Sequence, residues 1–371
     1  MTSARMSQGG PSSLPRTVII GTGSSIPARV VSNEAFLDRH FFEDYDQRFP
    51  DDTTPKIVAK LKEITDIEQR RYAADDLVAS DLAFEAGVQA LAAAAIDPET
   101  LDYVIVAHNF GDVRADNRRS DLVPSLAARV KERLRIANPD CVCYDIAFGC
   151  PGWLQAVIQA DYYLRSGDAR RALVIGTETL SRIYDPYDRD CMIYADGAGA
   201  VVLEAQAGAE PVGILAHAVR SDTLDHARLL WMGGSYNPEA GDHALCLKMQ
   251  GRKLYEYALG HVPGVVQRCL DKSGLHLEDV DKVLIHQANG KMDDAILKRL
   301  FRLYGVKQVP PGIMPMTISW LGNSSVATLP TLLDLIQRGQ LPEQKLASGA
   351  NVVFASVGAG MNINAVVYRC P

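Results

Sequence analysis

The sequence predicts a duplicated α/β fold, in which each of two similar halves combines helices with a buried sheet. Continuous apolar strand candidates alternate with helical patterns, and such strands indicate sheets that are covered on both faces. The same order of elements occurs twice along the chain of 371 residues. Matching landmarks such as Val174 and Val353 lie roughly 180 residues apart, and so long a period indicates two copies of one domain rather than a solenoid.

The first half is predicted to cover residues 17–207. It begins with a strand at 17–27, and after a charged segment at 40–65 it continues with a long helix at 80–96. The remaining predicted elements are, in chain order, a strand in PETLDYVIVAHN, a helix in LVPSLAARVKERL, the strand CVCYDIAF, the helix WLQAVIQADYYL and the strand ALVIGTE.

The second half, residues 208–371, is predicted to repeat this order. GRKLYEYALGHVPGVVQRCLDKSG is predicted to be helical, and it is followed by a strand in LEDVDKVLIHQAN and the helix KMDDAILKRLFRLYG. TISWLGNSSVATLPTLLDLIQRG is interpreted as a strand, a turn and a helix, and NVVFASVGAG as the last strand.

Composition and charge exclude several classes of protein. The formal net charge of −7 argues against general nucleic-acid binding. The seven cysteines form no disulfide framework and no zinc-like pairing with histidine, so we expect a reducing, cytoplasmic location and no metal. Residues 1–16 are polar and are expected to form a flexible tail rather than a signal peptide. The most apolar short run, ALAAAAI at 90–96, is too short to span a membrane.

Cys150 stands between Gly149 and the pair Pro151-Gly152, with a predicted strand before it and a predicted helix after it. It is therefore expected on a sharp strand-to-helix turn. The partial positive charge of a helix N-terminus favours a thiolate over a thiol, as in a nucleophile. On this pattern alone, an inert buried cysteine is an equally good interpretation.

Two copies of one fold bring equivalent turns together about a pseudo-two-fold axis. Cys150 of the first half should then face Asn323 of the second half. His286 follows the strand that matches YVIVAH in the first half, so we expect these three side chains to meet in one cleft. A lone histidine after a strand is more often structural, but its coincidence with the other two residues favours a catalytic role.

Five short motifs carry a family resemblance. They are GCPG at 149–152, MIYADGAGAVVLE at 192–204, HQAN at 286–289, LGNSS at 321–325 and VGAG at 357–360. With these motifs in this order, the chain resembles the β-ketoacyl-acyl-carrier-protein synthase III family of thiolase-like condensing enzymes, over nearly all of its length after residue 16. The resemblance implies a thiolase-like fold whose two α/β halves pack as a five-layer αβαβα sandwich.

The resemblance also implies a chemistry. Cys150 would take an acyl group from a thioester, and His286 and Asn323 would hold the thioester carbonyl of malonyl-carrier protein while CO2 leaves. The resulting enolate would attack the acyl-cysteine, whose oxyanion would be held by N–H groups of Cys150 and of the turn formed by Gly358, Ala359 and Gly360. No cofactor is implied, because acyl-coenzyme A or acyl-carrier protein is the substrate.

Further residues match substrate-binding positions of the family. Arg182 matches a contact to the adenine of coenzyme A, and Asn289 and Lys291 match positions along the pantetheine tunnel and its mouth. Val123 matches a residue that reaches across a homodimer interface to close the acyl pocket, where a small side chain would leave room for longer or branched chains. Lys298, Arg299 and Arg302 can form one basic helix face for an acidic carrier protein.

Departures from the family pattern leave alternatives open. The segment at 40–65 is longer and more acidic than usual, and the loop at 110–121 is enlarged. The product could belong to fatty-acid initiation or to a polyketide or pigment pathway. The acceptor could instead be a β-ketoacyl carbon nucleophile, as in dialkylresorcinol formation, or an alcohol or amine. A silent partner subunit is a third interpretation, and the intact Cys150, His286 and Asn323 weigh against it.

Overall fold

The computed structural model describes residues 15–208, 211–241 and 244–371. The tail predicted at residues 1–16 lies outside the described residues except for its last two. The first strand, β1, begins at Arg16. Within the described residues, no helix combines the length and the apolar character that a membrane crossing requires.

The first half contains a five-stranded sheet. Its strand order is β1-β11-β10-β6-β9, in which β10 pairs parallel with β6 and β6 with β9, whereas β11 pairs antiparallel with β1 and β10. The bounds are β1 Arg16–Ser25, β11 Asp196–Gln206, β10 Arg171–Thr179, β6 Tyr103–Ala107 and β9 Val142–Ile146.

The second half contains a four-stranded sheet with the same pattern of pairing. Its order is β12-β17-β16-β15, with β15 and β16 parallel and the other two pairs antiparallel. The bounds are β12 Gly213–Ser221, β17 Asn362–Arg369, β16 Asn351–Gly358 and β15 Lys282–Ile285. We propose that the boundary between the halves lies in the link from Gln206 to Gly213.

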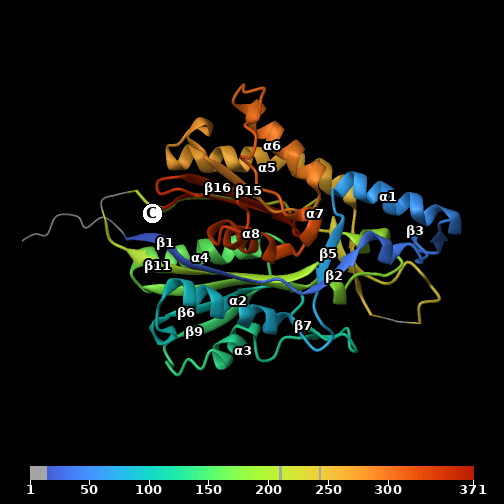
Figure 1. Ribbon diagram of the computed structural model, residues 1–371, viewed down its shortest axis with the longest axis horizontal. Helices are drawn as coiled ribbons and strands as arrows, with labels where there is room; N and C mark the ends of the chain where they lie inside the picture. The colour runs from blue at the N-terminus through green and yellow to red at the C-terminus, as the bar shows by residue number, and fades with distance from the viewer. Residues whose placement is uncertain (1–14, 209–210, 242–243) are drawn as a thin grey trace, which may run out of the picture.

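Helices form three layers around the two sheets, as Figure 1 shows. The middle layer, between the sheets, is made of α4 Gly152–Ser166 and α8 Thr328–Gln337. One outer layer contains α2 Ala79–Ala94 and α3 Leu126–Arg133, and the other contains α5 Gly251–Ser273 and α6 Gly290–Leu303. The predicted five-layer αβαβα sandwich is therefore confirmed.

Additional elements extend the molecule beyond α7, at the right of Figure 1. They include α1 Thr54–Thr65, which occupies the segment that sequence analysis described only as charged. The remaining strands form two-stranded sheets, which are β2 Arg29–Ser32 with β5 Gln69–Tyr72, β3 Phe42–Asp44 with β4 Gln47–Arg48, β7 Asp112–Val113 with β8 Ser120–Asp121, and β13 Leu230–Gly233 with β14 Cys246–Met249.

Two predictions about the second half are wrong. NVVFASVGAG is not the last strand, because the VGAG segment ends β16 and turns the chain into the antiparallel strand β17. TISW is not a strand but leads into a short helix, α7 Ile318–Leu321. The backbone N–H groups of Thr317 and Ile318 donate to the Gln287 side-chain oxygen at 2.8 and 3.0 Å, so they are not available for a sheet.

Candidate active site

Cys150 lies on the turn between β9 and α4, and Pro151 caps the helix. Gly149 has a φ of 71°, which a residue with a side chain adopts only at a cost. Its N–H donates to the side-chain oxygen of Asn109 at 2.8 Å. The tight turn therefore points Cys150 away from the strand and directly in front of the N-terminus of α4.

The end of β16 packs against this turn. A Cβ added to Gly358 would lie 2.6 Å from the backbone nitrogen of Cys150, and one added to Gly149 would lie 2.8 Å from the nitrogen of Ala359. Neither position therefore has room for a side chain. This close approach places the backbone of the predicted oxyanion turn next to that of Cys150.

His286 follows β15, and its N–H donates to the carbonyl of Ala355 at 2.9 Å. The residue is 2 % exposed, and neither ring nitrogen has a hydrogen-bond partner. Burial lowers the pKa of its imidazole to about 4, so the ring is neutral at physiological pH. A neutral imidazole can donate one hydrogen bond and accept another without carrying a charge.

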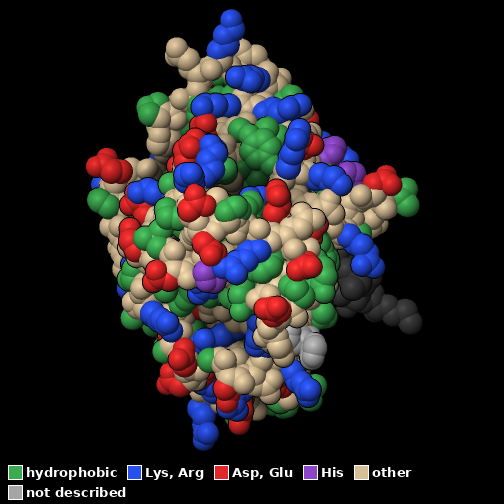
Figure 2. Space-filling model, turned by 90° about the vertical axis from the view of Figure 1, so that its right-hand side faces the viewer, with side chains coloured by type: hydrophobic (Ala, Val, Ile, Leu, Met, Phe, Trp, Pro, Cys, Tyr) green, Lys and Arg blue, Asp and Glu red, His purple; other side chains and the backbone are tan. Residues whose placement is uncertain are grey.

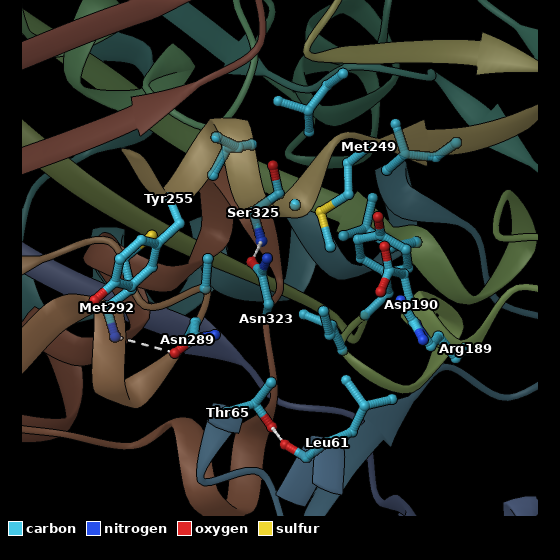
Figure 3. A pocket seen from close by; sticks show the side chains of 18 of the residues that line it. Leu61, Thr65, Arg189, Asp190, Met249, Tyr255, Asn289, Met292, Asn323 and Ser325 are labelled. Carbon is cyan, nitrogen blue, oxygen red and sulfur yellow. Dashed lines mark hydrogen bonds between the residues drawn. The ribbon is translucent and has the colours of Figure 1, made fainter. Parts of the chain in front are cut away.

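Asn323 is fixed by backbone pairing to the first half. Its backbone N–H donates to the carbonyl of Ile193 at 3.0 Å, and its backbone carbonyl accepts from the N–H of Ala195 at 2.8 Å. Its side-chain oxygen accepts from the N–H of Ser325 at 2.8 Å, a bond drawn in Figure 3. Since the oxygen is used in this way, the amide nitrogen is the group that can donate to a substrate.

These three residues line one cavity of about 870 Å³. Its walls are mainly apolar, and its mouth includes the exposed basic residues Lys56, Lys60, Arg189 and Arg252. Figure 2 shows the face that carries α1, where lysine and arginine side chains surround a recess with hydrophobic side chains inside. The apolar wall residues include Ile57, Leu61, Ile64, Leu180, Ile193, Leu230, Met232, Leu247, Met249 and Leu254.

The thiolate expected from the sequence is not the resting form of Cys150. Burial raises the pKa of the thiol to about 11, while a hydrogen bond from the Ser325 hydroxyl at 3.3 Å acts in the opposite direction. The N-terminus of α4 follows the cysteine as predicted, but the loss of solvation outweighs the favourable effects. The free site therefore holds a thiol.

The predicted substrate-binding residues do not all reach this cavity. Gly358, Ala359 and Asn289 line it, and Asn289 caps α6 by accepting from the N–H of Met292 at 3.0 Å, as Figure 3 shows. Gly360 and Lys291 do not line it; the Lys291 ammonium pairs with Glu63 on α1 at 3.2 Å. The remaining predicted residues lie elsewhere.

Arg182 does not line the cavity, and its contact with the adenine of coenzyme A stays a prediction. Its guanidinium donates to the carbonyl of Ala74 at 2.8 Å and pairs with Asp75 at 3.5 Å, so it is committed to a neighbouring loop. Val123 is 84 % exposed on the surface of the chain. Lys298, Arg299 and Arg302 are exposed on α6, with Lys298 paired to Asp294 at 2.5 Å.

Arg189 and Asp190, which Figure 3 shows side by side, are among the polar cavity residues that were not predicted from the sequence. They belong to the segment DPYDRD, whose other acidic residues Asp185 and Asp188 bind the buried Lys248 at 2.6 and 3.4 Å. Burial raises the pKa of Asp190 to about 7. The sequence shows that this segment is rich in charged residues. It does not show which of its carboxylates bind the buried lysine and which one lines the cavity.

Metal binding gains no support from the geometry. Across residues 15–208, 211–241 and 244–371, histidine, cysteine, aspartate and glutamate side chains nowhere gather in a group of three or more that could hold an ion. The cavity itself presents a thiol, a neutral imidazole and a carboxamide, together with the Asp190 carboxyl and basic side chains at its mouth.

Comparison with known proteins identifies the family. Residues 144–223 match the family model of 3-oxoacyl-[acyl-carrier-protein (ACP)] synthase III, and residues 270–370 match its C-terminal model. The β-ketoacyl-[acyl-carrier-protein] synthase III of Erythrobacter litoralis is 35% identical over 95% of this chain and 99% of its own length. That of a Chelativorans species is 33% identical over the same shares.

Solved structures have the same fold. The 3-oxoacyl-(acyl carrier protein) synthase III of Pseudomonas aeruginosa superposes with a TM-score of 0.78 at 28% identity, over 96% of this chain and 98% of the other. The priming β-ketosynthase of the R1128 polyketide pathway gives a TM-score of 0.78 at 24% identity, over 98% and 99% of the two chains, and shows the fold alone. The sequence relatives, with the match of both family models, establish that this chain belongs to the β-ketoacyl-acyl-carrier-protein synthase III family of acyl-transferring condensing enzymes.

Proposed function

We propose that this chain forms a carbon–carbon bond by decarboxylative Claisen condensation, with Cys150, His286 and Asn323 as its catalytic residues. The observation that carries the proposal is the buried imidazole of His286, which has no partner and shares an apolar cavity with the other two side chains. An unpaired polar group in a protein interior costs free energy. A substrate carbonyl would supply the missing hydrogen bond.

In the first half-reaction, the sulfur of Cys150 attacks the carbonyl of an acyl thioester. The tetrahedral oxyanion is held by the N–H of Cys150 and by a second N–H from the Gly358-Ala359-Gly360 turn. The bond to the original sulfur then breaks, and the proton lost by Cys150 neutralises the departing thiolate. Sulfur suits both this step and the next because it is a good nucleophile and a good leaving group.

In the second half-reaction, His286 and Asn323 donate hydrogen bonds to the thioester carbonyl of a malonyl group. The bond to the carboxylate breaks, CO2 leaves, and the two donors stabilise the enolate oxygen. The enolate carbon attacks the acyl-cysteine, and the released Cys150 sulfur takes up a proton. A low pKa suits His286, because a neutral donor does not attract the malonyl carboxylate that has to leave.

The shape and charge of the surface support the partners that we propose. The apolar walls fit a pantetheine arm and an acyl chain, and the basic residues at the mouth fit the phosphates of coenzyme A or an acidic carrier protein. We assign Lys298, Arg299 and Arg302 on α6 to docking of the carrier protein. The product would enter fatty-acid initiation or a polyketide or pigment pathway.

A homodimer is also proposed. Strand β9 forms an edge of the five-stranded sheet, and the neighbouring loop exposes Leu122 by 50 % and Val123 by 84 %. Apolar side chains exposed beside an open sheet edge favour association with a second copy. Val123 could then close the acyl pocket of the partner, as the resemblance implies.

Intact mass spectrometry tests the proposal. The protein is incubated with acyl-coenzyme A and acyl-carrier-protein thioesters of two to sixteen carbons, beside Cys150→Ala. We expect a mass gain of one acyl group that is absent from the variant, and its discharge with release of CO2 when malonyl-carrier protein is added. A loaded enzyme that malonyl does not discharge would indicate another acceptor. No loading by any thioester would contradict the role of Cys150 and favour a silent subunit.

A further inference from the structure

Asn109 connects three segments of the site, although its motif was not singled out from the sequence. It follows β6 by two residues and lines the cavity. Its side-chain oxygen accepts from the N–H of Gly149 at 2.8 Å. Its side-chain nitrogen donates to Glu178 at 2.6 Å and to the hydroxyl of Ser325 at 3.3 Å. The carboxamide therefore uses both of its hydrogens and its oxygen on neighbouring loops.

Glu178 fixes the orientation of this carboxamide. It is 1 % exposed on β10, and one of its oxygens accepts from both the backbone N–H and the side-chain nitrogen of Asn109, at 2.8 and 2.6 Å. A flipped amide would direct its oxygen at the Glu178 oxygen and its NH2 group at the N–H of Gly149. The buried glutamate thus selects the one orientation that supports the nucleophile's turn.

Ser325 continues the chain of hydrogen bonds to the sulfur. It has a φ of 52°, which is rare for a residue with a side chain, and its N–H donates to the side-chain oxygen of Asn323. Because its hydroxyl oxygen accepts from Asn109, its own hydrogen is free to point at the sulfur of Cys150, 3.3 Å away. One network therefore joins the nucleophile to the loop that holds the second substrate.

We propose that Asn109, anchored by Glu178, is a positioning residue that directs the Ser325 hydroxyl at the sulfur of Cys150 and so stabilises its negative charge as acylation begins and as the product leaves. The proposal rests on the role proposed above for Cys150. It goes beyond that role because it assigns a function to three residues that do not bind the transferred group.

The test measures the thiolate character of Cys150 without any substrate. Iodoacetamide alkylation of the full-length protein at pH 8 is followed by intact mass, with Cys150→Ala as the background for the other cysteines. Asn109→Ala and Ser325→Ala should each slow alkylation of Cys150 about tenfold, which corresponds to about one pH unit in its titration. The double variant should be no slower than either single one, because both remove the same hydrogen bond.

A matched pair at Glu178 keeps the proposal testable if Asn109→Ala does not fold. Glu178→Gln retains an oxygen that can accept from Asn109 and should alkylate at least as fast as the native chain, whereas Glu178→Leu, of similar size, should be slowed like Asn109→Ala. Equal rates for the Gln and Leu variants, or additive effects of Asn109→Ala and Ser325→Ala, would overturn the proposal. A failure of acyl loading would count against the function of Cys150 but would leave this measurement intact.

Discussion

Two histidines occupy equivalent places in the two halves and have different surroundings. His108 follows β6 and His286 follows β15, and each is nearly inaccessible, at 3 % and 2 % exposure. The Nδ1 atom of His108 accepts from the N–H of Gly111 at 3.0 Å, so its Nε2–H donates to Asp145, also at 3.0 Å. Neither nitrogen of His286 has a partner. The duplicated fold therefore places a histidine at the same point in each half. Whether that histidine is structural or can bind a substrate depends on whether neighbouring groups use its ring nitrogens.

Alanine at each histidine gives the largest expected contrast. His286→Ala should lower the rate of condensation on the order of 10²–10³-fold, because it removes one donor to the enolate oxygen, while acyl loading of Cys150 continues. His108→Ala should leave the chemical steps nearly unchanged but cost about 1–3 kcal/mol of unfolding free energy, because it leaves Asp145 and Gly111 without this partner. Loading by intact mass, product formation and urea unfolding separate the two effects.

The opposite pattern would contradict the comparison. If His108→Ala abolished condensation in a folded protein, or if His286→Ala lost stability but kept its rate, the presence or absence of hydrogen-bond partners would not distinguish the two roles.

The ends of equivalent strands provide a second contrast. β10 ends at Thr179, whereas the equivalent position of β16 is Gly358, where a Cβ would lie 2.6 Å from the Cys150 nitrogen and 2.7 Å from Cδ of Pro151. Gly358→Ala should therefore displace the turn that carries Cys150, lower the unfolding free energy by about 1–3 kcal/mol and slow acyl loading. Gly260→Ala in α5 is the control, because a Cβ added there would have no neighbour within 4 Å among the described residues outside the backbone of its own helix, and it should leave acyl loading unchanged. Unaltered loading in Gly358→Ala would show that the turn tolerates displacement.

The pH dependence of condensation should reflect the low pKa of His286. Burial lowers this pKa from 6.5 to about 4, so the ring stays neutral as the pH falls to 5.5 and the rate should change little. A histidine of ordinary pKa would be mostly protonated there, and the rate would fall about tenfold. The same shift makes stability depend on pH. As the pH falls, His286 is protonated in the unfolded chain near pH 6.5 but in the folded chain only near pH 4. The free energy of unfolding is therefore unaffected by this group above pH 6.5 and decreases as the pH falls toward 4. Urea unfolding at pH 7, 5.5 and 4.5 measures this decrease in the free energy of unfolding. The decrease should be smaller in His286→Gln, because glutamine does not bind the proton.

Much of this arrangement could be predicted from the sequence because the repeat is strong. Apolar strands alternate with helical patterns in both halves, and matching landmarks lie at nearly the same spacing. Val174 and Val353 are 179 residues apart, and the similar separation of 173 residues relates Cys150 to Asn323. The location of Cys150 on a strand-to-helix turn followed from breakers on both sides of it.

What could not be predicted depends on contacts between distant segments. TISW has the composition of a strand, but the side chain of Gln287 takes two of its N–H groups. The protonation of Cys150 depends on burial, which no local pattern reports. Asn109 lies 69 residues from Glu178 and 216 residues from Ser325 in the sequence, so their network is visible only in the folded chain.

The smallest expected effect concerns the charge on two equivalent helices, α3 and α6. On α3, Arg129 pairs with Asp112 at 2.6 Å and Arg133 with Asp81 at 2.5 Å, whereas no carboxylate of the described residues lies within ion-pair distance of Arg299 or Arg302 on α6. Unpaired cations on an otherwise acidic protein attract an acidic partner.

Replacing both Arg299 and Arg302 by alanine should therefore raise the KM for malonyl-carrier protein about two- to fivefold at low salt and less at high salt, since the interaction is exposed and screened. The KM for acyl-coenzyme A should not change. Arg133→Ala on α3 is the matched control, because it removes a cation that already has a partner, and it should leave both values unaltered. An equal rise in KM for the two substrates, or the same rise in the control, would assign the effect to the fold rather than to docking at α6.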